Sequence, residues 1–163
     1  NGVVPYDWAT FLKTRIEGLS EHAPLVGLTR GGYKLVYTDT PTEFFKAAET
    51  KGKIVNLSYS LGITIGKDGV LSAVNWDTPA FKAGLTAGET IVAVNGTAYS
   101  DDGVKDAVKA TAKADAPLVE LLIKDGERYR TVKIDYHGGL KYPRLERIEG
   151  TPARLDDIYA PKK

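Results

Sequence analysis

The sequence predicts an α+β protein in which a helical N-terminal appendage precedes five or six short strands and two helices. Three observations support this prediction. Apolar residues recur at helical spacing near the N-terminus, and short apolar or alternating runs follow from residue 54 onward. Turn-forming glycines separate these runs. Residues 77–96 combine a short helix, two glycine turns, a buried strand and a hairpin. We therefore expect a partly open β-barrel or sandwich.

The composition excludes several classes of protein. The chain has 163 residues, 22 basic and 21 acidic side chains and a net charge of +1. A near-neutral balance argues against nucleic acid or an anionic membrane surface as the main partner. No apolar run is long enough to span a bilayer. Cysteine is absent, so disulfides and thiolate metal sites are excluded. Methionine is also absent, and we expect the chain to be a fragment of a longer protein.

The first 53 residues predict two helices and one strand. Asp7 is a candidate helix cap, and the apolar residues from Trp8 to Leu19 recur at helical spacing, so a helix should end between Gly18 and Glu21. Residues 23–27 read as a loop, and residues 33–38 alternate as a strand. Residues 40–43 match a capping box with proline at the first helical position. The second helix, with Phe44, Phe45 and Ala48 on one face, should stop at Gly52.

The next region, residues 54–99, reads as short strands joined by tight turns. Strands are expected at 61–65 and 70–74, with a turn at 67–69. Pro79 suits the first position of a short helix, and Gly84 suits a helix end with positive φ. Residues 90–94 are β-branched and apolar, as in a buried strand. Asn95-Gly96 is a strong hairpin signal.

One helix and two strands complete the predicted compact unit. Ser100 can cap a helix over 101–113, whose apolar stripe includes Val104 and Val108. Strands are expected at 118–124 and 129–136, and residues 137–139 should end the unit. The remaining residues are charged and proline-containing, and we expect them to be partly ordered. The predicted organisation is an appendage at 1–53, a compact domain at 54–138 and a tail at 139–163.

The order of parts in residues 77–96, with Leu61-Gly62-Ile63 before it and a capped helix after it, resembles a PDZ domain of the bacterial protease-associated type. The resemblance implies that a peptide end adds as an extra strand in a groove between a sheet edge and the second helix. It implies that the N–H groups of Leu61, Gly62 and Ile63 hold the peptide carboxylate. The edge strand would be Ile63, Thr64 and Ile65.

The second helix would line the rest of the groove. By the resemblance, its first residue faces the third-from-last peptide side chain, and in this chain that residue is Asp101. Lys105 and Val108 would follow on the same side. The family's histidine at the helix start is absent, so its preference for a hydroxyl-bearing ligand does not carry over. An acidic residue there would favour a donor or a basic side chain on the ligand.

The segments before the compact domain are similar to the end of the catalytic region in glycyl-aminopeptidase-like metallopeptidases, family sixty-one of that class. Residues 5–16, residues 32–37 and Ser60-Leu61-Gly62 fall in the matching order. This resemblance implies a bacterial zinc aminopeptidase as the parent protein, and an envelope location. The zinc motif H-E-x-x-H is absent, and His22 and His137 lie far apart in the sequence. We therefore expect no catalysis and no cofactor in this chain.

Three functions remain open from the sequence. The leading hypothesis is a non-catalytic module that binds the C-terminus of a peptide or protein. The alternative is a structural docking domain whose groove is filled by its own chain and which packs on the missing zinc catalytic domain. Independent enzymatic activity is the weakest of the three. Leu61, Ile63 and Val108 also fit as plain core residues, and Gly62 as a bulge glycine.

Overall fold

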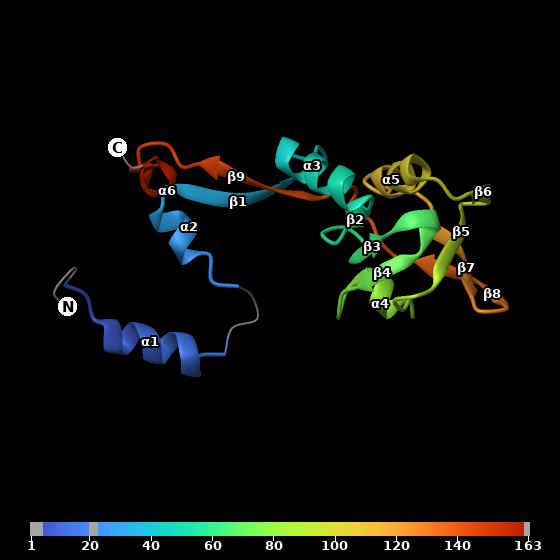
Figure 1. Ribbon diagram of the computed structural model, residues 1–163, viewed down its shortest axis with the longest axis horizontal. Helices are drawn as coiled ribbons and strands as arrows, with labels where there is room; N and C mark the ends of the chain where they lie inside the picture. Colours follow the sequence, from blue (N-terminus) through green and yellow to red (C-terminus); the bar gives the residue numbers. More distant parts are fainter. Residues whose placement is uncertain (1–4, 20–22, 162–163) are drawn as a thin grey trace. The chain divides into compact units, whose positions relative to one another are not determined.

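The computed structural model describes residues 5–19 and 23–161 and has an α+β fold with small antiparallel sheets, which confirms the predicted class (Figure 1). Contacts divide the chain into two compact units. The first comprises Asn1–Leu35 and Glu146–Lys163, and the second comprises Val36–Leu145. The second unit thus extends on both sides of the predicted 54–138 region. Among the described residues, no helix is long and apolar enough to cross a membrane.

The first unit contains helices α1 (Trp8–Glu17), α2 (Val26–Arg30) and α6 (Arg154–Tyr159). The predicted cap of α1 is confirmed, because Asp7 Oδ1 accepts a 3.0 Å hydrogen bond from the Thr10 amide. Gly18 caps the helix at its C-terminal end, and residues 20–22, where the prediction placed part of that end, lie outside the described residues. The loop predicted over 23–27 is too long, since α2 begins at Val26.

The C-terminal tail is more regular than predicted. Strand β9 (Tyr142–Arg147) pairs with strand β1 (Tyr33–Thr38), and Figure 1 shows the two strands side by side. Within the first unit, the hydroxyl of Tyr33 donates to a carboxylate oxygen of Asp156, and Arg147 donates to the carbonyl oxygen of Gly32. These long-range contacts order the tail, and the sequence pattern alone did not predict them.

Helix α3 (Glu43–Gly52) begins later than the capping box predicted. Thr42, not Thr40, is the cap, and its hydroxyl accepts a 3.2 Å hydrogen bond from the amide of Phe45. The expected apolar face is also wrong in part, because Phe44 is 83% exposed. Ala48 is exposed as well, so the inward face of α3 is formed by Phe45 and Glu49.

Seven strands lie in residues 54–138, where five or six were predicted, and they form two sheets. One sheet has the order β2-β3-β4 and the other has the order β6-β5-β7-β8, with every pair antiparallel. The bounds are β2 (Val55–Leu57), β3 (Ile63–Ile65), β4 (Leu71–Val74), β5 (Thr90–Val94), β6 (Thr97–Ala98), β7 (Val119–Asp125) and β8 (Arg128–Ile134).

Two α-helices and a short 3₁₀ helix accompany these strands, namely α4 (Pro79–Lys82), α5 (Asp101–Ala110) and η1 (Lys67–Gly69). The predicted cap of α5 is confirmed, because Ser100 Oγ accepts a hydrogen bond from the Gly103 amide. The helix ends before Thr111, three residues short of the predicted Lys113. At the β5–β6 hairpin both Asn95 and Gly96 have positive φ, as a two-residue turn of this type requires.

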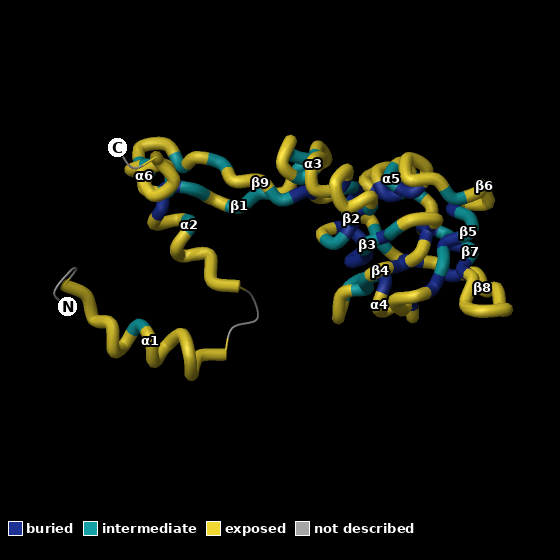
Figure 2. Tube along the Cα trace, viewed as in Figure 1, coloured by how far each residue is buried: buried dark blue, intermediate teal, exposed yellow. Residues whose placement is uncertain are grey.

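The hydrophobic core of the second unit joins both sheets to α4 and α5. Its fully buried members come from almost every element, and Figure 2 shows buried segments running through this unit. Burying side chains of this size stabilises the fold by roughly 1.5–3 kcal/mol each. The core residues are Val55, Leu57, Leu61, Ile63, Ile65, Leu71, Ala80, Leu85, Ile91, Val94, Val104, Val108, Val119, Leu121, Ile123, Val132 and Ile134.

Candidate functional site

The loop between β2 and β3 has the geometry of an oxygen-binding cradle. Its turn is set locally, since Asn56 Oδ1 accepts a hydrogen bond from the amide of Ser58. The amides of Ser60 and Gly62 both donate to the carbonyl oxygen of Leu57, each at 3.0 Å. Two N–H groups converging on one oxygen atom form the arrangement that also binds anionic oxygens.

Gly62 is required where it stands. Its φ is +86°, and an added β-carbon would lie 2.2 Å from the side chain of Thr78. The loop is also hydrogen-bonded to the residue that follows β4 and to helix α4. The amide of Asn75 donates to Gly62, and the amide of Ala80 donates to the carbonyl oxygen of Leu61. Residues 75–80, which overlap the start of the 77–96 segment, therefore hold the loop in place through these hydrogen bonds.

The predicted carboxylate-binding residues lie together, but they are not open to solvent. Leu61 and Ile63 are fully buried in the core, and Gly62 is buried beside them. The N–H of Gly62 already has an intramolecular acceptor in Leu57. One of the three predicted carboxylate-binding amides is thus engaged by the chain itself.

The prediction that Ile63, Thr64 and Ile65 form an open sheet edge is wrong. Strand β3 lies in the middle of its sheet, between β2 and β4. Val55 pairs with Ile65, Asn56 with Thr64, and Leu57 with Ile63. The physical reason is that a segment just upstream of the loop is apolar at alternate positions, so it folds back and completes the sheet.

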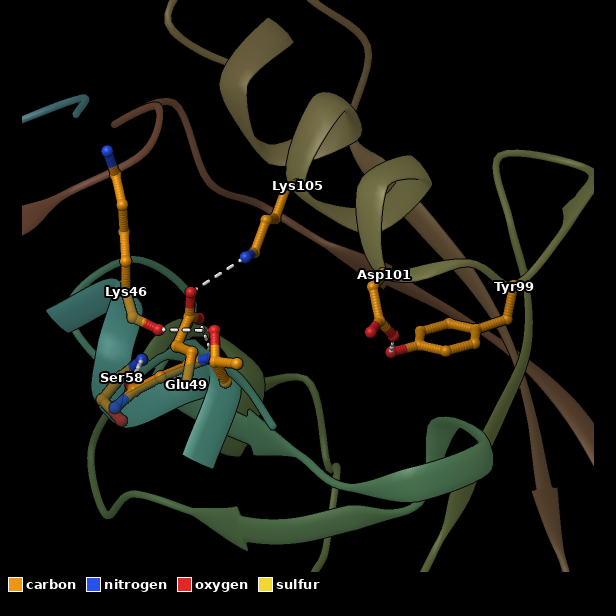
Figure 3. Close-up of polar contacts among 8 residues, drawn as sticks. Lys46, Glu49, Ser58, Tyr99, Asp101 and Lys105 are labelled. Carbon is orange, nitrogen blue, oxygen red and sulfur yellow. Dashed lines mark hydrogen bonds and ion pairs between the residues drawn. The ribbon is translucent and has the colours of Figure 1, made fainter. Parts of the chain in front are cut away.

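The residues predicted on the second helix have separate environments. Val108 is fully buried, so it packs in the core and does not line an open groove. Asp101 is exposed at the start of α5 and accepts a 2.8 Å hydrogen bond from the hydroxyl of Tyr99. Lys105 is half-buried, and its Nζ lies 3.0 Å from Glu49 Oε2. Figure 3 shows Lys105 on α5 and Glu49 on α3 facing each other.

Glu49 is the functional candidate that the sequence prediction missed. Its carboxylate is only 8% exposed. Oε1 accepts a 2.7 Å hydrogen bond from the amide of Asn56 in β2, while Oε2 pairs with Lys105. A buried carboxylate requires such partners, because an unpaired buried charge is strongly unfavourable. The available signal was its spacing of four residues from Phe45, which places both on one face of the helix.

Two tyrosines near this region have raised side-chain pKa values. Partial burial, followed by the hydrogen bond to Asp101, raises the pKa of Tyr99 well above its ordinary value near 10. Burial also raises the pKa of Tyr142, with a smaller contribution from the nearby Glu49 carboxylate. The Tyr142 ring packs edge-on against Phe45, with 5.1 Å between centroids. This contact helps to seat α3 over the start of β9.

Open space remains at the upstream end of β2. A cavity of about 660 Å³ is lined by residues 66–68, 90–92 and 98–101, together with Lys53. A second cavity, of about 450 Å³, lies among α3, β2 and the first turn of α5 and includes Glu49 and Lys105. In the described residues, no three His, Cys, Asp or Glu side chains are grouped as ligands for a metal ion.

The two histidines can be placed only in part. His22 lies outside the described residues. His137 follows β8, and its Nε2 lies 3.2 Å from a carboxylate oxygen of Asp135 at the protein surface. Both side chains are exposed, and exposed pairs of this kind contribute little to stability.

Comparisons with known proteins found no matching family model and no matching curated protein. Among solved structures, the chain is similar to an aminopeptidase N family protein from Idiomarina loihiensis, with 18% identity and a TM-score of 0.56. That match covers 98% of this chain but only 27% of the Idiomarina chain. At this identity the likeness shows a shared fold.

A second similar structure is the HtrA3 PDZ domain bound to a phage-derived ligand, FGRWV. It is 17% identical, and the match covers 71% of this chain and 91% of that chain. Its TM-score is 0.35, which is too low to support an inference about this chain.

Proposed function

We propose that this chain is a non-catalytic accessory region of a larger aminopeptidase-like protein, with a PDZ-like unit whose strand-addition groove is occupied by its own strand β2. The observation that carries this proposal is the pairing of β2 with β3, which fills the flank where an external strand would add. The full-length likeness to a segment of a longer protein supports the accessory role. In this role the unit docks against the zinc catalytic domain that the sequence resemblance implies.

A titration tests whether the groove is occupied. Short peptides with free C-termini are added while the backbone amide signals of Leu61, Gly62 and Ile63 are followed by NMR. We expect no saturable shift at these amides, because β2 already pairs with β3 and the Gly62 amide already donates to Leu57. Saturable shifts that disappear when the same peptides are amidated would contradict self-occupation.

The docking role needs a separate experiment. Amide hydrogen exchange of residues 36–145 is compared between this chain alone and the longer parent protein. A docked unit shows slowed exchange over a contiguous surface in the parent. Equal exchange rates in the two proteins would contradict docking and leave the groove assignment unaffected.

A second function, capture of an external peptide end, is favoured by one observation. The amides of Ser60 and Gly62 converge on one carbonyl oxygen, and Gly62 is one of the residues expected to hold a carboxylate. Peptide capture at this position requires that β2 first leaves the sheet. The two functions therefore share one site and differ in what occupies it.

A further inference from the structure

We propose that Glu49 is a latch that keeps β2 in the groove as a built-in ligand. Release of the latch would open the site to an extended peptide with apolar side chains at its last and third-from-last positions. This inference rests on the proposed function, because it assumes that β2 occupies the strand-addition site. It adds the class of external ligand and the contact that controls access.

Strand β2 has the features of a bound peptide. It runs antiparallel to β3, and its last residue places a carbonyl oxygen on the amides of the cradle. Val55 and Leu57 are 2% and 1% exposed, while Asn56 between them is only half-buried. An external peptide in the same register would meet the same two apolar sites. The matching ligand therefore ends in valine, a polar residue and leucine.

Glu49 fixes the outer side of this built-in ligand. The Asn56 amide points away from β3 and donates to Glu49 Oε1, so the carboxylate caps the outer edge of β2 as a neighbouring strand would. The second carboxylate oxygen is held by Lys105 on α5. One side chain thus ties α3, β2 and α5 together, and Figure 3 shows it between the two helices.

The tether makes β2 a strong competitor. A linked segment acts at an effective concentration on the order of millimolar or higher, so an external peptide binds weakly while the latch is closed. β2 is only three residues long. It is linked to the end of α3 through Lys53, which has a left-handed backbone conformation (φ 49°). Removing a hydrogen bond to a charged group shifts such an equilibrium by about tenfold to a hundredfold. Loss of the latch should therefore make peptide binding measurable.

The test compares Glu49→Ala with Glu43→Ala, a matched control on the same helix. Glu43 is exposed and pairs only with Lys46 among the contacts described, so its loss leaves β2 in place. Hydrogen exchange at the Gly62 amide reports whether β2 has left, because this amide donates to Leu57. Binding is measured with an acetylated peptide ending in Ile-Val-Asn-Leu, its amidated form and an Ile-Asp-Asn-Asp form.

We expect Glu49→Ala to accelerate exchange at Gly62 at least tenfold and to bind the free-acid apolar peptide at least tenfold more tightly than the wild type. The amidated and acidic peptides should bind weakly, and Glu43→Ala should behave as the wild type. Faster exchange with no preference for the apolar peptide would overturn the ligand class. Unchanged exchange at Gly62 would overturn the latch.

Two milder variants test the latch in case Glu49→Ala does not fold. Glu49→Gln keeps the acceptor for Asn56 but removes the charge, and Lys105→Ala removes only the cation. Each should give a smaller increase in the same direction, and no increase in either would count against the latch. If the wild type already binds the apolar peptide as tightly as Glu49→Ala does, the self-occupied groove itself is wrong, which separates that failure from failure of the latch.

Discussion

The amide nitrogen of Gly62 lies 3.0 Å from the carbonyl oxygen of Leu57. This one hydrogen bond joins the glycine that shapes the loop to the residue that ends β2. Gly62 is one of the three residues whose amides the sequence resemblance assigns to a peptide carboxylate, and its amide is engaged by an oxygen of the chain itself. The proposed self-occupied groove depends on this contact and on the pairing of β2 with β3.

Gly62→Ala should destabilise the protein by about 2 kcal/mol or more. The residue has positive φ, and the new β-carbon would meet the Thr78 side chain at 2.2 Å. Gly88→Ala is the matched control, because Gly88 also has positive φ but has open space around it. Urea unfolding should show a larger loss for Gly62→Ala. Equal losses would mean that backbone strain alone explains the requirement for glycine.

Arg130→Ala should cost about 1–3 kcal/mol. Arg130 donates to Glu89 at 2.7 Å and to the carbonyl oxygen of Gly84 at 2.8 Å. Its loss leaves the 4%-exposed Glu89 carboxylate with the Thr86 amide as its remaining described partner. The partial exposure of Arg130 lowers the expected value.

The control for this prediction is Arg128→Ala, on the exposed end of the same strand. Its effect in the same urea experiment should stay within about 0.5 kcal/mol. If both arginine variants lose equal stability, the Glu89 contact is not the cause.

Ser100→Ala should lower stability by about 1 kcal/mol, and Ser100→Gly by only a few tenths. The hydroxyl oxygen accepts from the Gly103 amide at 3.1 Å, which satisfies one free N–H of α5. Thermal or urea unfolding of the two variants measures the difference. Equal stability of the alanine variant and the wild type would mean that the cap contributes nothing.

Stability should fall as pH rises above 10. Burial raises the pKa of Tyr99, Tyr136 and Tyr142 in the folded protein above the ordinary value near 10. The unfolded chain then loses these protons first, so the folded state binds more protons and its advantage decreases with pH. Each such tyrosine contributes a slope of up to about 1.4 kcal/mol per pH unit.

Tyr99→Phe tests this pH dependence. Removing one of the three groups should flatten the fall in unfolding free energy measured in urea between pH 10 and pH 11. Below pH 9 the variant and the wild type should show parallel profiles. An unchanged slope above pH 10 would show that Tyr99 does not contribute to the alkaline loss.

Local signals predicted most of the fold correctly. Caps such as Asp7 and Ser100 and the Asn95-Gly96 turn act over a few residues, so their geometry follows from residue type. Strand β9 and helix α6 were not predicted, because their order depends on contacts with residues far away in the sequence. The start of α3 was predicted two residues too early, because Thr40 and Thr42 can each serve as a helix cap.

The site was predicted only in part. Leu61 and Gly62 lie in the loop before β3 and Ile63 begins that strand, while their role in holding a carboxylate stays a prediction. The leading hypothesis did not predict the pairing of β2 with β3, because the residue pattern of one strand does not specify which segment pairs with it. Only the alternative function included self-occupation. Glu49 was missed because a charged residue on a short helix most often faces solvent.

The most direct test of the central claim is the NOE between the α-protons of Asn56 and Thr64 in the protein without added peptide. These residues are opposite each other in the β2–β3 pair, and the Asn56 amide donates outward to Glu49. Such a non-hydrogen-bonded pair brings the two Cα atoms to about 4.5 Å. We predict a strong NOE. Its absence, together with rapid hydrogen exchange at the Gly62 amide, which donates to Leu57, would show an open groove and contradict self-occupation.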